Sequence, residues 1–557
     1  MANLFVKKSL TQLLDQASGN SSGLKRTLTA VNLVALGIGA IIGAGLFVRT
    51  AAAAAEAAGP AVTLSFIVAA VGCAFAGLCY AEFAAMIPIA GSAYTYSYAT
   101  LGELVAWIIG WALIMEYALG AATVSIAWSE YLNKLLGGAI PYEWSHSPLE
   151  HSVSGVSGIM NAPALIILLA LTLLLIRGTQ QSATVNAIIV FIKVAIVLVF
   201  IVVGWHFING ANHDPYFLPQ AKATDPNNMF KWGWGGVLGG AAIVFFAFIG
   251  FDAVSTAAQE AKNPAKDMPI GILGSLVVCT ILYVLFSYVL TGVSNWEEFR
   301  TAGKEASVAF AIDNHMPGFG WLATLVTVAI LAGFSSVILV MLLGQSRVFY
   351  SMANDGLLPK AFSELHPEYR TPYKSNWILF VFVGLFAAFV PGSIAGDLTS
   401  FGTLFAFIIV CIGVWVLRVK SPELNRPFKA PLVPVVSTLG VLVCGGMIIA
   451  IDPMTLKTAL WWMALGIGVY FLYSINRSKL QNTTTEGNPL YTYIGAGLLA
   501  IALVYGGMHL THDKINSNDP AVIAAIQAKN AAYMTKYYIS MALALVGIMA
   551  LVMGRKK

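Results

Sequence analysis

Runs of apolar residues, each about twenty residues long, follow one another from residue 31 almost to the end of the chain. An α-helix needs about twenty residues to cross the hydrocarbon core of a bilayer. The runs therefore predict about fourteen transmembrane helices joined by mostly short polar connections. The predicted spans are residues 31–57, 60–86, 101–132, 162–177, 183–206, 236–259, 269–293, 319–350, 375–391, 400–418, 432–450, 457–475, 489–508 and 536–553.

Composition strengthens this prediction. The 557 residues are 58% hydrophobic and only 10% charged, whereas a soluble domain carries roughly a quarter charged residues. The chain is therefore expected to be an all-α membrane protein surrounded by the lipid bilayer. A net charge of +5 carries no signal for nucleic acid, so no nucleic-acid partner is predicted.

The distribution of positive charge predicts the orientation. With both termini in the cytoplasm, twenty of the 31 lysine and arginine residues fall on the inner side and ten on the outer side. This bias favours a multi-pass protein of the cell (plasma or inner) membrane with cytoplasmic termini. Residues 1–30 form a cytoplasmic segment, in which apolar residues at helical spacing beside Lys7 and Lys8 predict an amphipathic surface helix.

Two of the predicted spans contain clustered glycines. The first reads LGIGAIIGAGLFV over residues 36–48, and the sixth reads WGWGGVLGGAAIVFFAFIGFD over residues 232–252. Glycine weakens a helix, and helix packing is the commoner reason for pairs such as Gly39 and Gly43. However, these spans lie five apart and in opposite orientation, and matched broken helices in inverted repeats indicate a transporter's midplane binding site.

The two breaks also predict a class of ligand. A half-helix that restarts near Gly43 presents backbone N–H groups and a positive dipole end, which suit a carboxylate. Carbonyl groups around Phe246, Ala247 and Ile249 suit an ammonium group. A site that takes both charges close together fits an L-amino acid.

Five motifs resemble the amino acid–polyamine–organocation superfamily, and most closely its cationic amino acid transporter family. They are GIGAIIGAGLFV (37–48), YAEFAAMIPIAGSAYTYSY (80–98), GWALIMEYALG (110–120), FFAFIGFD (245–252) and SRVFYSMANDGLLP (346–359). The resemblance covers essentially the whole chain. It implies a LeuT-type 5+5 inverted-repeat core and secondary transport of amino acids by alternating access. The first repeat would be 31–206, the second 236–418, and four additional C-terminal spans would occupy 432–553.

The resemblance also implies binding residues. Ile41, Gly43, Ala44 and Gly45 would face the substrate carboxylate, and Phe246, Ala247 and Ile249 its amine. Many relatives have Ser or Thr where this chain has Ala44, so backbone amides would carry more of the carboxylate recognition. On the eighth span, Phe334 is either core packing or a bulky limit on the substrate side chain, and the latter favours a small or medium amino acid, neutral or cationic.

Three ionisable residues lie well inside apolar runs: Glu116, Lys193 and Asp252. Such residues normally face the bundle interior and have a partner. In sodium-coupled relatives a sodium ion lies between the first, fifth and eighth spans, and several proton-coupled relatives have a lysine there. The resemblance places Lys193 at that location. Because apolar surroundings disfavour the charged form of an amine, Lys193 could exchange a proton, with Glu116 and Asp252 either coupling residues or a structural pair.

Other readings stay open at this point. A cationic substrate is possible if Glu116 or Asp252 is free, and amino acid exchange, polyamine or organocation transport, or a transporter-like sensor are alternatives. Ser335 and Ser336 are expected to bond carbonyls of their own helix, and Glu82 to anchor the inner end of its span. No enzyme active site, cofactor or metal site is predicted, and a small accessory membrane subunit or a homodimer is possible.

Overall fold

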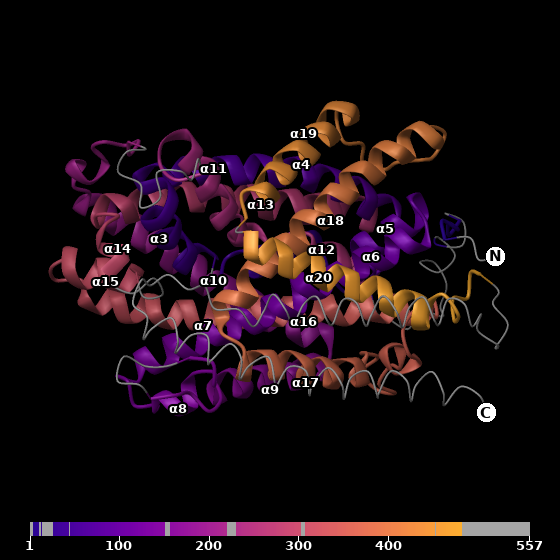
Figure 1. The fold of residues 1–557 in the computed structure, drawn as a ribbon, viewed down its shortest axis with the longest axis horizontal. Helices are drawn as coiled ribbons and strands as arrows, with labels where there is room; N and C mark the ends of the chain where they lie inside the picture. The colour runs from indigo at the N-terminus through magenta and orange to yellow at the C-terminus, as the bar shows by residue number, and fades with distance from the viewer. Residues whose placement is uncertain are drawn as a thin grey trace, which may run out of the picture.

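The computed structural model describes residues 4–9, 13, 26–43, 45–150, 156–219, 230–301, 307–451 and 453–481. In these ranges the regular secondary structure is helical, and isolated bridge residues occur at Leu28 and Ala261, which pair with each other, and at Ser157. Most of the long helices run along the long axis of the molecule (Figure 1). We call its two ends the Leu28 end, where the first helix begins, and the Trp232 end, opposite to it.

Eight helical stretches in the described residues are long and apolar enough to cross a membrane, and three shorter apolar helices accompany them. One of the eight, Ala30–Met86, contains both of the first two predicted spans. The all-helical membrane fold is thus confirmed, and the described helices match the first twelve predicted spans. The predicted spans 489–508 and 536–553 lie outside the described residues.

The first span is broken, as predicted. Helix α2 (Ala30–Ile41) begins at Thr29, whose side chain caps the Asn32 N–H while the Asn32 side chain accepts from the Thr29 N–H. The helix ends where Ile42 turns to an extended conformation, with φ −76° and ψ 102°. The chain resumes as the π-helical turn η2 (Gly45–Arg49), followed by α3 (Thr50–Ala53) and η3 (Ala54–Ala58).

The sixth span is broken as well. Helix α11 (Gly233–Val244) narrows into the 3₁₀ turn η9 (Phe245–Phe248), after which Ile249 is extended. Gly250 has φ +112°, a conformation that favours glycine, and the span continues as α12 (Ala253–Thr256) and η10 (Ala258–Glu260). Both glycine-rich spans therefore lose regular helix near their centres.

The two broken spans lie side by side and antiparallel. At the Leu28 end, the N–H groups of Thr27 and Leu28 donate to Glu260 O, each at 2.9 Å, and Lys262 N–H returns a bond to Leu28 O at 2.8 Å. At the other end, Trp232 N–H donates to Ala57 O at 2.7 Å. The start of each span thus contacts the end of the other, which is the arrangement that inverted repeats would produce.

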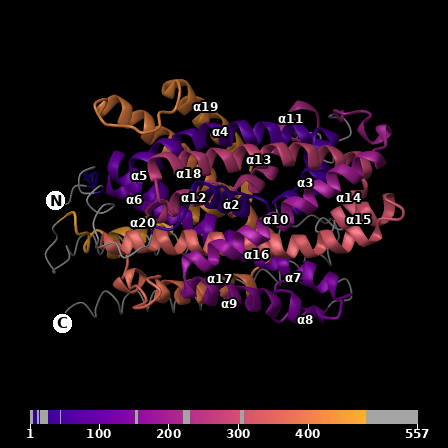
Figure 2. The same cartoon turned by 180° about the vertical axis from the view of Figure 1, so that it is seen from behind.

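The remaining helices surround this pair (Figure 2). They are η4 (Gly59–Ala61), α4 (Val62–Met86), α5 (Ser92–Thr100), α6 (Glu103–Leu113), η5 (Ile114–Leu119), α7 (Gly120–Leu135), α8 (Tyr142–Ser145), α9 (Ala162–Arg177), α10 (Thr179–Gly204), η6 (Trp205–Phe207), η7 (Gly210–His213), α13 (Pro264–Val293), α14 (Glu298–Thr301), α15 (Ser307–His315), α16 (Gly320–Asn354), η11 (Lys360–Ser363), α17 (Tyr373–Phe389), α18 (Gly392–Lys420), α19 (Val433–Ile449), α20 (Pro453–Val469) and η12 (Tyr470–Ser474).

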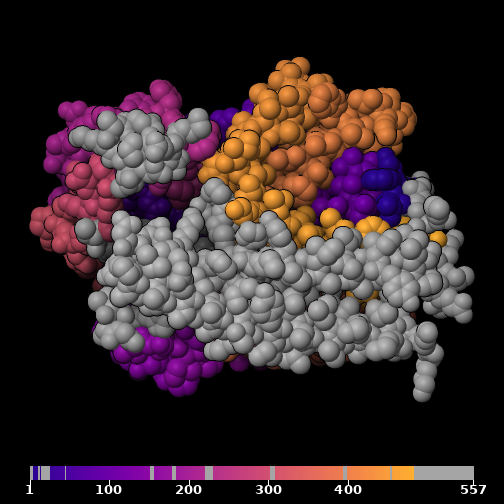
Figure 3. Space-filling view, in the orientation of Figure 1, coloured from indigo at the N-terminus to yellow at the C-terminus, as the bar shows by residue number. Residues whose placement is uncertain are grey.

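One of the additional spans, α20, is attached to the core by specific polar contacts. The indole of Trp107 on α6 donates to Gly466 O of α20 at 2.7 Å, and that of Trp111 donates to Trp462 O at 2.8 Å. Helices α18 to α20, in orange and yellow, form much of the upper face in Figure 3. Because α6 belongs to the third span, α20 packs directly on the core.

An ion pair joins α4 to α18 at the Leu28 end. The Arg418 guanidinium donates two hydrogen bonds to Glu82, at 2.8 and 2.7 Å, so Glu82 anchors the end of α4 to α18 as expected. Residues 4–9 form a turn and an irregular stretch that bonds to the start of α6, with Glu103 N–H donating to Val6 O. The predicted amphipathic helix therefore does not include these residues, and most of residues 1–30 lie outside the described ranges.

Candidate functional site

The two helix breaks meet backbone to backbone. A Cβ atom on Gly45 would lie 2.1 Å from Ala247 Cα, a distance that no side chain can occupy. Gly45 is therefore required for the close approach of the two breaks, whatever else it contacts. Helix packing and substrate binding are therefore not alternatives at Gly45, because the packing itself builds the candidate site.

Gly43 faces a different helix. A Cβ atom on Gly43 would lie 2.4 Å from Val337 Cγ2, on α16. The Gly43 carbonyl also accepts from the N–H groups of Leu46 and Phe47, at 3.2 and 3.4 Å. Val337 was not among the predicted site residues, and Ala44 lies outside the described residues.

The carbonyls of the two breaks converge on Tyr283 of α13. Its hydroxyl lies 2.7 Å from Ile41 O and 2.8 Å from Ala247 O, and donates to them. Tyr283 is fully buried, with its ring between Phe66 and Phe248 at centroid distances of 5.4 and 5.2 Å. Sequence reasoning missed Tyr283 because one tyrosine in an apolar span carries no distinguishing pattern.

Lys193 of α10 is fully buried and reaches the break in the first span. Its ammonium nitrogen donates to Gly39 O at 2.8 Å and to Ile42 O at 2.7 Å. These are carbonyl oxygens that α2 cannot pair internally where it ends. The structure thus places Lys193 against the first span, beside Gly333 of the eighth, whose Cβ would lie 3.4 Å from Lys193 Cδ.

Two further polar side chains hold the same part of α2. Ser336 of α16 donates to Gly39 O at 3.1 Å and to the Asn186 side-chain oxygen, and Asn186 of α10 donates to Ala35 O at 3.2 Å. Ser335 donates to Leu331 O of its own helix at 2.9 Å, as expected. The same expectation for Ser336 is wrong, because its hydroxyl donates to Gly39 O of the neighbouring helix α2 instead. Asn186 precedes Lys193 by two helical turns, a spacing that could have identified it.

Glu116 and Asp252 lie together in a second buried cluster. Asp252 accepts a hydrogen bond from the Tyr117 hydroxyl, and Asp252 and Thr403 are polar neighbours of Glu116. Both carboxyl side chains are fully buried, and Lys193 donates to backbone carbonyls rather than to either of them. Lys193 is therefore hydrogen-bonded to the first span and not to this acidic cluster.

The remaining predicted residues lie near the breaks. Phe246 and Ile249 are buried, and the Arg49 guanidinium carbon lies 5.2 Å from the centroid of the Phe246 ring. Phe334 is fully buried and packs edge-on against Tyr131 of α7, with ring centroids 5.6 Å apart. It lies one helical turn from Val337, so both the packing reading and the size-limiting reading remain consistent with its position.

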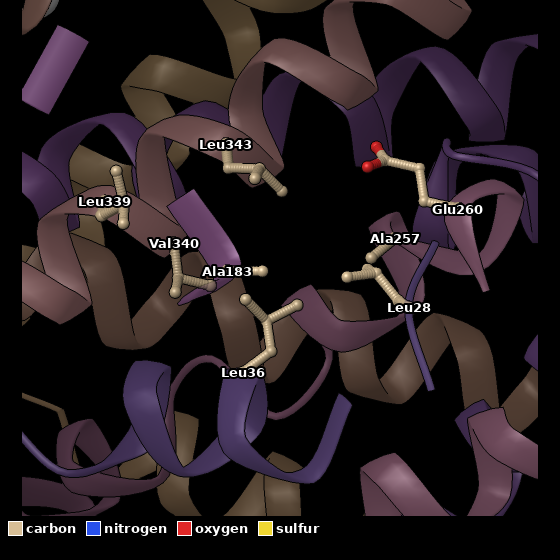
Figure 4. Close-up of a pocket in the computed structure, with 8 residues that line it drawn as sticks. All are labelled: Leu28, Leu36, Ala183, Ala257, Glu260, Leu339, Val340 and Leu343. Atoms are coloured by element: carbon tan, nitrogen blue, oxygen red, sulfur yellow. The ribbon is translucent and has the colours of Figure 1, made fainter. Parts of the chain in front are cut away.

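A small cavity lies between the breaks and the Leu28 end. It measures about 10 Å³ and is lined by Leu28, Leu36, Ala183, Ala257, Glu260, Leu339, Val340 and Leu343. Figure 4 shows Leu28, Ala257 and Glu260 on one side of the cavity, with Leu339 and Val340 of α16 on the other. Glu260 is its one charged residue, and its carboxylate accepts from Arg347 Nε at 2.9 Å.

At the Trp232 end, Arg300 links the first broken span to the start of the sixth. Arg300 Nε donates to Ala55 O at 3.0 Å, and its guanidinium carbon lies 4.9 Å from the Trp296 ring centroid and 5.5 Å from that of Trp232. Contacts therefore join the two broken spans to their neighbours at both ends. In the described part of the chain, no group of three His, Cys, Asp or Glu side chains is arranged to hold a metal ion.

Comparison with known proteins agrees with this geometry. The family model for amino acid permeases matches residues 28–471. The chain is 44% identical to the branched-chain amino acid permease BcaP of Bacillus subtilis, over 86% of this chain and 99% of that protein. It is 40% identical to the methylthioribose transporter of the same organism, over 86% of this chain and 100% of that protein.

A human relative extends the comparison. The chain is 33% identical to the cationic amino acid transporter 4 of Homo sapiens, over 78% of this chain and 66% of that protein. These relatives are permeases and transporters rather than enzymes. The chain is an integral multi-pass membrane protein that belongs to the amino acid permease family, within the amino acid–polyamine–organocation superfamily.

Proposed function

We propose that this protein carries small or medium neutral L-amino acids across the cell membrane together with protons, by alternating access between two inverted repeats. In this proposal the Leu28 end and both termini lie in the cytoplasm. Amino acid transport itself is supported by the family and the relatives. The proton, the neutral side chain and the orientation are the proposed parts.

The observation that carries the proposal is the contact between the two broken spans. Gly45 meets Ala247 backbone to backbone, so the dipole ends and open carbonyls of both spans lie within one small region. Unpaired backbone at the depth of the hydrocarbon is tolerated only where protein or a cavity satisfies it. A zwitterion bound here would place its carboxylate at the restart of the first span and its ammonium at the carbonyls of the sixth.

A neutral side chain is supported by the surroundings of the breaks. Val337, Phe334 and Phe246 are apolar and buried, and one relative with 44% identity is named for branched-chain amino acids. Apolar side chains discriminate against charge, because a charged group would lose its hydration without gaining a partner. Leucine, isoleucine, valine and alanine are therefore the first substrates to test.

Proton coupling is supported by Lys193. Its ammonium donates to two carbonyls at the break in the first span, and the resemblance described above would put this amine where sodium-coupled relatives bind their ion. Loss of the proton would leave two N–H donors for Gly39 O and Ile42 O but would remove the charge that strengthens both bonds, and would so weaken the attachment of α2 to α10. Protonation at Lys193 and movement of α2 are thereby linked, which is what coupling requires.

A cationic substrate is the second candidate. Glu116 and Asp252 form a buried acidic pair, and the human relative is named for cationic amino acids. An ammonium or guanidinium beside Glu116 would give that acid a charged partner. The pair could equally carry the proton, and exchange or polyamine transport would use the same breaks differently.

A ligand screen tests the proposal directly. The purified protein is heated with each common amino acid, with spermidine and with methylthioribose, since a bound ligand stabilises the folded state by mass action. We expect the largest shifts with leucine, isoleucine, valine or alanine. Shifts confined to arginine and lysine would support the second candidate, and a shift with methylthioribose alone would contradict amino acid transport.

A further inference from the structure

Tyr283 joins the two helix breaks through one hydroxyl group. The hydroxyl oxygen lies 2.7 Å from Ile41 O, at the end of α2, and 2.8 Å from Ala247 O, in η9. A phenol carries one proton, so this proton is shared between two carbonyls. The distance between the two carbonyl oxygens is thereby limited by a single atom that lies between them.

The position of the hydroxyl is fixed from a third helix. Tyr283 projects from α13, and its ring is held by Phe66 of α4 and Phe248 of η9. The side chain is fully buried, so no solvent competes for the two carbonyls. Neither half-helix therefore sets the separation of the carbonyls by itself, because α13 imposes it on both.

Ala247 O belongs to the region that the proposed function assigns to the substrate ammonium, and the Tyr283 hydroxyl brings Ile41 O, from the end of α2, to the same place. A primary ammonium offers three N–H groups in a compact volume, and each can reach a carbonyl only if that carbonyl is correctly placed. Each carbonyl oxygen has two lone pairs, so a bond from Tyr283 leaves one for the substrate. The hydroxyl can thus orient the acceptors without occupying all of their capacity.

We propose that Tyr283 is a positioning residue that makes the transporter specific for an unsubstituted α-amine. By holding Ile41 O and Ala247 O together, its hydroxyl leaves room for N–H groups but not for a methyl group on the nitrogen. This inference rests on the proposed function, because it assumes that an amino acid binds at the breaks. It goes beyond that proposal by naming the residue and the chemical group that it selects.

The test compares each amino acid with its N-methyl derivative. The probes are L-leucine with N-methyl-L-leucine and L-alanine with N-methyl-L-alanine, and binding to the purified full chain is measured by thermal shift over a range of concentrations. In the wild-type protein we expect methylation to weaken binding by about tenfold or more. In Tyr283→Phe the ring packing is kept and the donor is lost.

For Tyr283→Phe we expect two changes. The affinity for the unmodified amino acid should fall by about fivefold to tenfold, the scale of one lost hydrogen bond. The ratio of the two affinities should shrink to about threefold or less, because the carbonyls can separate and admit the methyl group. A residue that merely stabilises the fold would lower the melting temperature and leave this ratio unchanged.

Tyr288→Phe is the matched control, since Tyr288 lies on the same helix and contacts Trp205 and His213 instead of the breaks. It should keep the wild-type ratio. If Tyr283→Phe does not fold, Tyr283→His is measured instead, because it retains an aromatic ring with an N–H donor. The inference then requires Tyr283→His to keep most of the wild-type ratio of the two affinities. An unchanged ratio in Tyr283→Phe, or its loss in Tyr283→His, overturns the inference.

The outcomes separate this inference from the proposed function. If the wild-type protein is stabilised by no amino acid, the proposed function fails first. If it binds leucine or alanine and its N-methyl derivative equally well, amino acid binding stands while the role of Tyr283 is rejected.

Discussion

The ammonium nitrogen of Lys193 lies 2.7 Å from the carbonyl oxygen of Ile42, the residue at which the first span leaves its helical path. A side chain from the fifth span thereby completes the hydrogen bonding of a broken helix from outside it. The strength of the contact depends on the charge state of the lysine, since hydrogen bonds from an ammonium are stronger than those from a neutral amine. The proposed coupling between protonation and the shape of the first span rests on this single relationship.

Replacing Lys193 should separate transport from the pH gradient. In liposomes with the membrane potential clamped, an outside one pH unit more acidic supports up to about tenfold accumulation if one proton accompanies each substrate. We expect wild-type protein to accumulate substrate without sodium, and Lys193→Ala to equilibrate or exchange it without accumulation. Lys193→Arg should fail equally, because the guanidinium cannot release its proton.

One result would contradict the proposed role of Lys193 in proton coupling. Accumulation by Lys193→Ala in response to the same gradient would show that the proton is carried elsewhere, and Glu116→Gln would then be the next variant to measure. Lys134→Ala serves as a control, since Lys134 lies in the last turn of α7 at the Trp232 end.

Two glycines of the first break should differ in how they can be rescued. Gly43→Ala places its Cβ against Val337 Cγ2, whereas Gly45→Ala places its Cβ against the Cα of Ala247. We expect each variant alone to lose most uptake and to lower the unfolding free energy by about 1–3 kcal/mol. Adding Val337→Ala should restore stability and part of the uptake to Gly43→Ala only, because it removes the obstructing methyl group.

Uptake and melting temperature of the single and double variants check this prediction. If Val337→Ala restores stability but no uptake, Gly43 also has a direct role in binding the carboxylate. If it restores neither, the contact with Val337 is not what requires glycine at position 43.

The sequence was sufficient to predict the breaks but not their neighbours. Glycines at 43, 45 and 250 weaken a helix wherever they occur, so the local pattern identified both broken spans. The contacts of Val337 and Tyr283 depend on how α16 and α13 are rotated about their axes, and a uniformly apolar span carries little information about rotation. Ser336 shows the same limit, since its bond to Gly39 O became possible only when α2 was placed beside α16.

Shortening Phe334 should reveal whether it limits the substrate. The ring is fully buried against Tyr131, one turn from Val337. We expect Phe334→Ala to extend uptake towards longer side chains such as methionine and phenylalanine, while lowering the unfolding free energy by about 3–5 kcal/mol through the cavity it leaves. Competition of each amino acid against labelled alanine uptake measures the change. An unchanged competition profile in stable Phe334→Ala protein would assign this ring to packing alone.

Breaking the Glu260–Arg347 pair should open the Leu28 end. The pair is nearly inaccessible, with side-chain exposures of 1% for Glu260 and 3% for Arg347, and it borders the small cavity below the breaks. Removing one partner of a buried pair leaves a buried charge uncompensated, at a cost of about 3–5 kcal/mol to the closed arrangement. Glu260→Gln should therefore favour conformations in which Arg347 reaches water.

A cysteine introduced at Leu343, in a background with the five native cysteines replaced, should then react faster with a polar thiol reagent than in the parent. Glu364→Gln is the matched control, because its pair with Lys374 is exposed on both sides and worth little. Equal labelling rates in Glu260→Gln, Glu364→Gln and the parent would show that the pair does not hold this end closed, and that the backbone contacts between Leu28 and Glu260 suffice.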